Sequence, residues 1–165
     1  GSTAVGKEIV RNSADTLKKV SLELGGNSPN ILFADADLDA AVKGAFNGIF
    51  YGKGDVCNAG SRLFIEKSVH DRVMEKLLER ARRLVPGDPL DPKTRLGALV
   101  SRAQMEKVLG YVNIGLEEGA QAVLPGGRVG ECGYFVKPTI FDCAETSMRI
   151  AQEEIFGPVL TVLTF

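Results

Sequence analysis

Segments with two different hydrophobic periods alternate along this 165-residue chain, and the alternation constrains the fold more than any other feature. Short apolar runs, or runs with an apolar residue at every second position, are typical of strands. Between them lie stretches with the three-to-four-residue spacing of amphipathic helices. Because strands separated by helices usually pair in parallel, the pattern predicts an α/β fold with a mostly parallel sheet and flanking helices.

The expected strands are short and are bounded by Gly, Pro or polar residues. They cover residues 18–24, 30–34, 62–66, 122–124, 135–141 (interrupted by Pro138) and 159–165. The expected helices begin at side chains whose oxygens can accept first-turn N–H groups. They cover about 3–13 after Ser2 or Thr3, 37–51 after Asp35 or Asp37, about 69–81 after Ser68, and a helix from a Ser101/Gln104 capping box to Gly119. Residues 52–60 and 86–97 are expected to be loops.

Composition excludes several classes of protein. Twenty Lys and Arg oppose 21 Asp and Glu with no long basic block, so we expect no nucleic-acid partner. The sequence contains no run of 18 apolar residues, so we expect no membrane-spanning helix. It also has no basic region followed by an apolar one at its start, so we expect no signal peptide. Three cysteines, one histidine and no C-x-x-C argue against a disulfide framework and a metal site. A reducing, cytoplasmic compartment is therefore expected.

Both ends of the sequence have an unusual form. The first residue is glycine rather than methionine, and residues 159–165 read as a strand with no stop signal. We therefore expect the chain to be truncated at both ends.

The first motif with chemical potential is Gly1-Ser2-Thr3-Ala4-Val5-Gly6. It lies at the expected start of a helix, where unpaired N–H groups and the helix dipole favour an anion such as phosphate. An ordinary capped helix explains the same residues, because the motif is neither G-x-G-x-x-G nor a P-loop.

The second motif is centred on Glu23, within Leu22-Glu23-Leu24-Gly25-Gly26-Asn27-Ser28-Pro29. A carboxylate withdrawn from water by apolar neighbours at a strand end suits a general base that works near neutral pH. The two glycines would let a ligand approach the backbone closely. The alternative is a solvent-facing Glu on an edge strand.

The third motif is Cys57, in the expected loop between a helix and a strand. Catalytic residues concentrate in loops on rigid scaffolds, and small polar neighbours would leave the sulfur accessible as a nucleophile. The alternative is a buried or incidental thiol. Cys132 and Cys143 lack this setting and are expected to be incidental.

Together these motifs resemble the aldehyde dehydrogenase superfamily over essentially the whole chain. The matching segments are GSTAVG at 1–6, LELGGNSPN at 22–30, the cysteine loop at 54–62, GDPLDP at 87–92 and QEEIFGPV at 152–159. The resemblance implies that residues 1–24 are the C-terminal tail of a cofactor-binding domain. It also implies that residues 25–165 form an incomplete catalytic (thiol) domain, in a protein that is a homodimer or homotetramer.

The resemblance implies NAD(P)-dependent oxidation of a small aldehyde to a carboxylic acid. Cys57 matches the nucleophile that forms a thiohemiacetal, and its backbone N–H would help to hold the oxyanion. After hydride transfer to NAD or NADP, water activated by Glu23 would hydrolyse the thioester.

The resemblance also implies a set of cofactor-binding residues. Gly1, Ser2 and Gly6 match residues near the cofactor phosphates, and Leu24 matches a residue near the nicotinamide. Glu154 matches the carboxylate that holds the nicotinamide ribose, and Phe156 matches the ring that packs beside it. Gln104 and Lys107 match residues that reach the adenosine ribose. No metal is implied. Without the resemblance, these last four positions read as a charged residue before a turn, a core residue, a cap and a solvated side chain.

Asp55 departs from the family pattern, which usually has Gln or Glu two residues before the cysteine. An acid so close to a thiol disfavours the thiolate, although Lys53 could offset it. Two alternatives stay open: a CoA-acylating semialdehyde dehydrogenase, a branch that generally lacks the Glu, and a catalytically inactive fragment or degenerate family member. Because a cofactor site split between two halves loses its orientation, we expect the isolated 165-residue piece to be inactive.

Overall fold

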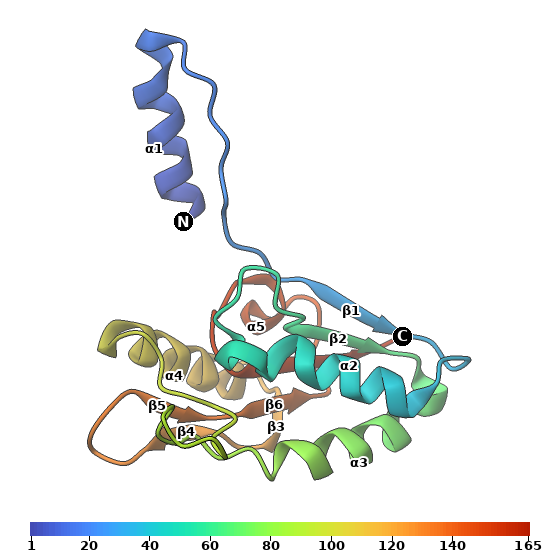
Figure 1. The fold of residues 1–165 in the computed structure, drawn as a ribbon. Helices are drawn as coiled ribbons and strands as arrows, with labels where there is room; N and C mark the ends of the chain where they lie inside the picture. Colours follow the sequence, from blue (N-terminus) through green and yellow to red (C-terminus); the bar gives the residue numbers. More distant parts are fainter.

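A computed structural model describes all residues from 1 to 165 and contains a five-stranded sheet (Figure 1). The strands lie in the order β1 (Pro29–Leu32), β2 (Arg62–Ile65), β7 (Val159–Thr164), β6 (Thr139–Asp142) and β3 (Gln121–Leu124). All neighbouring strands pair in parallel except β3 with β6. A separate antiparallel pair is formed by β4 (Gly127–Val129) and β5 (Phe135–Lys137). The predicted α/β class with a mostly parallel sheet is confirmed.

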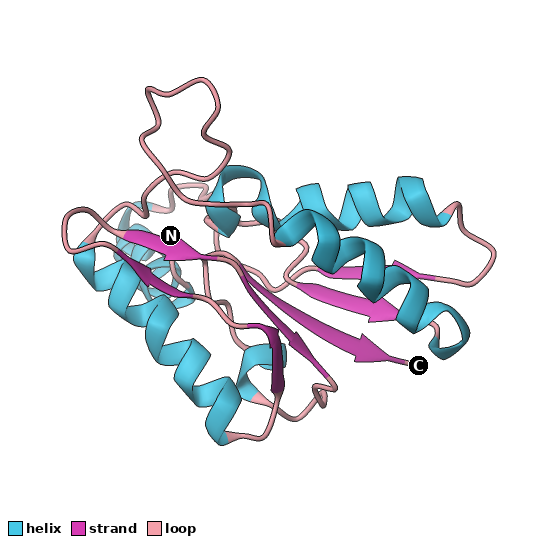
Figure 2. Cartoon of the chain, turned by 90° about the horizontal axis from the view of Figure 1, so that it is seen from below, coloured by secondary structure: helices cyan, strands magenta, loops and turns pink.

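Helices cover both faces of the sheet (Figure 2). The helices are α2 (Leu38–Phe50) and α3 (His70–Ala81) on one face, and α4 (Arg102–Glu117) and α5 (Arg149–Gln152) on the other. Alternation along the strands produces this division, because successive side chains point to opposite faces. On β6, Ile140 packs into the core beneath α2 and α3, and the next residue, Phe141, packs into the core beneath α4 and α5.

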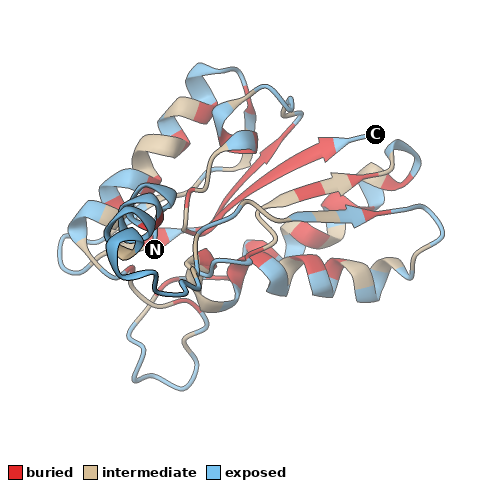
Figure 3. Ribbon diagram, turned by 90° about the horizontal axis from the view of Figure 1, so that it is seen from above, coloured by how far each residue is buried: buried red, intermediate tan, exposed pale blue.

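The N-terminal segment projects from the rest of the molecule. Helix α1 (Thr3–Ser13) stands away from the sheet, and residues 18–24 run back beside it toward β1 (Figure 1). Most of this segment is exposed, and Gly6 is the buried residue of α1 (Figure 3). The division of the chain at residue 24 into two domains stays a prediction.

The strand predicted over residues 18–24 is wrong. The segment has the alternating apolar pattern, but it has no partner strand and forms no ladder. A strand needs a neighbour to satisfy its N–H and C=O groups. Instead, Leu22 and Leu24 lie against Gly6 of α1.

Three helices begin at side chains among those predicted to cap them. The side chains of Ser2, Asp37 and Ser101 accept first-turn N–H groups of α1, α2 and α4, as expected. The predicted Ser68 cap is wrong: a 3-10 turn precedes α3, and the Ser68 hydroxyl donates to the Glu66 carboxylate.

None of the helices combines the length and apolar character needed to cross a membrane.

Candidate active site

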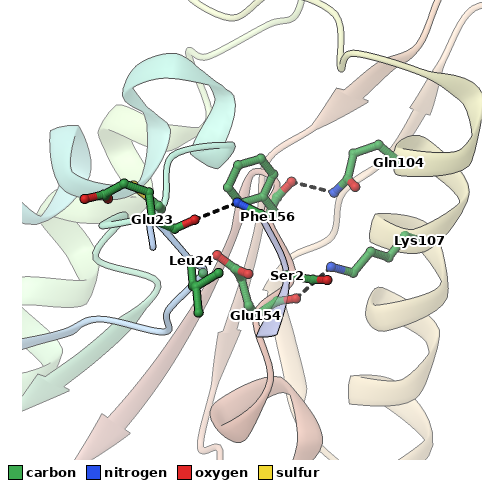
Figure 4. A pocket seen from close by; sticks show the side chains of 10 residues that line it. Ser2, Glu23, Leu24, Gln104, Lys107, Glu154 and Phe156 are labelled. Carbon is green, nitrogen blue, oxygen red and sulfur yellow. Dashed lines mark hydrogen bonds between the residues drawn. The ribbon is translucent and has the colours of Figure 1, made fainter. Parts of the chain in front are cut away.

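One pocket of about 480 Å³ brings together segments from the whole length of the chain (Figure 4). It is lined by Gly1, Ser2, Glu23, Leu24, Gly25, Cys57, Gln104, Lys107, Glu154 and Phe156. Nine of the ten expected site residues are in this set. The exception is Gly6, which lies one helical turn deeper in α1, beneath Leu22 and Leu24. The structure thus brings the motifs together, and the roles of the residues stay predictions.

The N-terminus of α1 forms one wall of the pocket. The Gly1 nitrogen donates to the Glu23 carbonyl at 2.8 Å, which ties the helix start to the returning segment. The Ser2 hydroxyl caps the helix by accepting from the Val5 N–H at 3.3 Å. The arrangement leaves the positive end of the α1 dipole facing the pocket, where it favours an anion.

Glu23 lies on this wall but is not withdrawn from water as expected. The residue is exposed, and its carboxylate has no hydrogen-bond partner within the chain. The reason is that no other element of the chain packs over this side chain of segment 18–24. The carboxylate is open to solvent, and Figure 4 shows it directed away from Phe156, Gln104 and Lys107.

The cysteine loop starts with three residues in left-handed backbone conformations. Gly52, Lys53 and Gly54 have φ angles of 64°, 67° and 71°. A side chain at Gly54 would overlap the backbone carbonyl of Gly157, so glycine is required there by both conformation and space. The loop leaves Cys57 exposed at the pocket. Its N–H donates no hydrogen bond within the chain and can serve an external acceptor.

The acid next to the cysteine is neutralised within the same loop. The Lys53 ammonium lies 3.1 Å from the Asp55 carboxylate, and the two side chains are 27% and 14% exposed. The positive charge of Lys53 therefore offsets the negative charge of Asp55 close to the cysteine. The departure from the family pattern at Asp55 is therefore accompanied by its own counter-ion.

Glu154 approaches the backbone where a ligand was expected to do so. Its carboxylate accepts from the Gly26 N–H at 3.1 Å and lies directly against Gly25, where a side chain would overlap it. Two residues further on, Phe156 adopts a left-handed backbone with φ of 61°. Such a conformation costs a non-glycine residue free energy and persists only where neighbours impose it.

Two side chains of α4 impose that backbone conformation (Figure 4). The Gln104 amide donates to the carbonyls of Ile155 and Phe156 at 3.1 and 2.7 Å, and the Lys107 ammonium donates to the Glu154 carbonyl at 2.9 Å. In the expected capping box, Gln104 would reach back to Ser101, so only the serine half of that box is observed. Contact of Gln104 and Lys107 with an adenosine ribose stays a prediction.

A polar cluster that was not predicted from the sequence lies behind this loop. The Tyr111 hydroxyl donates to the Glu153 carboxylate at 2.5 Å, and Arg149 donates to it twice, at 2.9 and 3.0 Å. These hydrogen bonds, first from Arg149 and then from Tyr111, lower the pKa of Glu153 to about 2. The i, i+4 spacing of Arg149 and Glu153 was a readable signal, whereas the contact with Tyr111 had none.

Comparison with known proteins agrees with the fold and the motifs. The sequence profile of the Aldehyde dehydrogenase family matches residues 1–165, and the chain belongs to this family. Betaine aldehyde dehydrogenase of Mesorhizobium japonicum is 45% identical over 170 residues, which include all of this chain and 35% of that protein. Retinal dehydrogenase 2 of Homo sapiens is 47% identical over 166 residues, again all of this chain and 32% of that protein.

Solved structures give the same result. An NAD+ complex of aldehyde dehydrogenase from Bacillus cereus superposes with a TM-score of 0.96 at 48% identity, covering 100% of this chain and 34% of that one. An NAD-dependent aldehyde dehydrogenase from Sinorhizobium meliloti gives a TM-score of 0.96 at 47% identity, with 100% and 33% covered. The chain thus spans about a third of the length of the relatives it matches.

Proposed function

We propose that the protein containing this chain oxidises a small aldehyde to a carboxylic acid with NAD or NADP. The observation that carries the proposal is the shared pocket: an exposed thiol, Cys57, and an exposed carboxylate, Glu23, line one cavity together with the positive end of α1. These are the nucleophile, the base and the anion-binding group that the reaction requires. The family membership of the chain supports the same reaction.

The first step is attack of the Cys57 thiolate on the carbonyl carbon of the aldehyde. The C–S bond forms as the carbonyl π bond breaks, which leaves negative charge on oxygen. The free N–H of Cys57 is the chain's own donor for this oxyanion. The chemistry that a nicotinamide supplies when bound is acceptance of the hydride from the same carbon. Cys57 then carries the acyl group as a thioester.

The second step is hydrolysis of that thioester. Glu23 takes a proton from a water molecule, the resulting hydroxide attacks the acyl carbon, and the Cys57 thiolate leaves with the C–S electron pair. The place of Glu23 on the wall of the pocket that also holds Cys57 supports this role.

The pocket has donors and acceptors that fit a dinucleotide. Gly1 and Ser2 provide the helix start for the phosphates, Glu154 a carboxylate for ribose hydroxyls, and Leu24 and Phe156 apolar surface for the nicotinamide. Gln104 and Lys107 lie on the opposite wall, on α4, as the candidates for the adenosine ribose. The Bacillus cereus relative was solved with NAD+, so NAD+ is the cofactor to assay first.

The test uses the protein expressed from its complete reading frame. We expect NADH formation from an aldehyde and NAD+, with water rather than CoA as the acyl acceptor. Cys57→Ala should abolish the reaction. Glu23→Gln should retain a burst of one NADH per site and then turn over slowly, because only hydrolysis is blocked. Acyl-CoA as the product, or full turnover by Glu23→Gln, would reject the assigned role of Glu23.

A homodimer or homotetramer is the assembly that we infer.

A further inference from the structure

We propose that Asn27 is a positioning residue that fixes the Glu154 segment and the cysteine loop relative to each other. The inference rests on the proposed function for the roles of the residues that Asn27 positions. Asn27 does not line the pocket. It is half-buried behind it, directly after the glycines that contact Glu154.

The amide nitrogen of Asn27 holds the segment that carries Glu154. It donates to the carbonyl of Ala151 at 3.1 Å and to that of Glu153 at 3.3 Å. The second carbonyl belongs to the peptide bond that precedes Glu154. Any shift of that peptide moves the Glu154 Cα, and with it the carboxylate that accepts from Gly26.

The amide oxygen of Asn27 holds the other side of the pocket. It accepts from the Ser61 hydroxyl at 2.5 Å, at the point where the cysteine loop enters β2. The backbone carbonyl of Asn27 also accepts from the Arg62 side chain at 2.8 Å. A side chain at Gly26 would lie 3.3 Å from the Cys57 carbonyl, so the two loops are in close contact here.

A carboxamide matches this set of partners with its two ends. Two carbonyls require a donor, and the serine hydroxyl requires an acceptor on the same side chain. Asp at this position keeps the acceptor but turns an oxygen toward the two carbonyls. Ala removes both contacts and leaves buried polar groups without partners. The two functions of the amide can therefore be separated by mutation.

The experiment compares variants that each remove one of the two contacts of the Asn27 amide. Asn27→Asp removes the bonds to Ala151 and Glu153 but keeps the bond to Ser61. We expect the Kd for NAD+ to rise about tenfold, as loss of one to two buried hydrogen bonds predicts, with little change in alkylation of Cys57 by iodoacetamide. Ser61→Ala removes the other contact. It should change the Cys57 alkylation rate and kcat by about threefold or more while the Kd for NAD+ stays at the wild-type value.

Three controls accompany these variants. Ser61→Thr keeps a hydroxyl and should restore the wild-type alkylation rate. Cys132 and Cys143 are also exposed, and their alkylation, mapped on the same digests by mass spectrometry, should be the same in every variant. Thermal unfolding checks that each variant is folded.

The positioning role is overturned if folded Asn27→Asp and Ser61→Ala differ from wild type only in thermal midpoint. It is also overturned if both variants lose NAD+ affinity and thiol reactivity in parallel, since a general loss of stability would do the same. If the wild-type protein binds no NAD+, the proposed function fails. The alkylation of Cys57 in Ser61→Ala and Ser61→Thr then still decides whether the Asn27–Ser61 contact positions the cysteine loop.

Discussion

The carboxylate of Glu154 and the backbone N–H of Gly26, 128 positions apart in the chain, are joined by a hydrogen bond of 3.1 Å. The neighbouring Gly25 makes this contact possible, because any side chain there would occupy the space of the carboxylate oxygens. The paired glycines of this motif therefore serve a contact within the protein. The same carboxylate remains at the pocket surface, where the proposed cofactor ribose would lie.

Gly25→Ala is expected to displace the Glu154 carboxylate and to raise the KM for NAD+ about tenfold, the effect of losing one charge-assisted hydrogen bond. Steady-state kinetics of the complete protein measure this. Gly44→Ala in α2 is the matched control, because a side chain at Gly44 would meet no atom within 4 Å. Equal KM values for the two variants would show that the Glu154 position does not matter for cofactor binding.

Lys53→Met is expected to slow alkylation of Cys57 at neutral pH by about threefold, because the half-buried Asp55 carboxylate would lose its counter-ion and disfavour the thiolate. Asp55→Gln should accelerate it by a similar factor, and the double variant should lie near wild type. Rates at several pH values with iodoacetamide give the comparison. Identical profiles in all four proteins would mean that this ion pair does not influence the thiol.

The pH dependence of stability should contain a contribution from His70, whose ring nitrogens lie 2.9 Å from the carboxylates of Asp71 and Asp142. Burial lowers the pKa of His70, but the hydrogen bonds to these two acids outweigh it and the net pKa is raised. The charged ring is therefore favoured in the folded state. Its contribution is complete below the unfolded value of about 6.5 and is lost as the pH rises through the raised pKa.

His70→Gln removes this titration. We expect its thermal midpoint to depend less steeply on pH than that of wild type, with the largest difference between the two proteins below about pH 6. Scanning calorimetry from acid to mildly alkaline pH provides the measurement. Parallel curves for the two proteins would exclude a contribution from the histidine.

Residues 1–165 expressed alone are expected to form no NADH from an aldehyde and NAD+. Helix α1, which carries one wall of the pocket, exposes Val5, Ile9 and Val10 at 53%, 45% and 50% and packs little against the rest of the chain. If this wall has no fixed orientation, the pocket does not hold the cofactor and the aldehyde in the geometry that makes their reaction fast. NADH formation above that of a Cys57→Ala control would contradict this expectation.

The sequence alone determined the fold class and the local features of the site. Strand and helix periods are repeated within each segment, so the α/β order could be predicted from nearest neighbours along the chain. The same local signals indicated the cap at Ser101 and narrowed two others to Ser2 or Thr3 and Asp35 or Asp37, of which the structure uses Ser2 and Asp37. Motif order was sufficient to place Cys57 in a loop and to indicate the family.

How the segments meet depends on long-range packing, which has no local pattern in the sequence. Four features had no signal in the sequence. They are the unpaired course of residues 18–24, the exposure of Glu23, the Asn27–Ser61 contact and the Tyr111–Glu153 hydrogen bond. The reason is the distance along the chain over which each interaction acts. Periodicity and capping depend on atoms a few residues apart, whereas these contacts depend on how α1, α4 and the loop before β7 pack against one another.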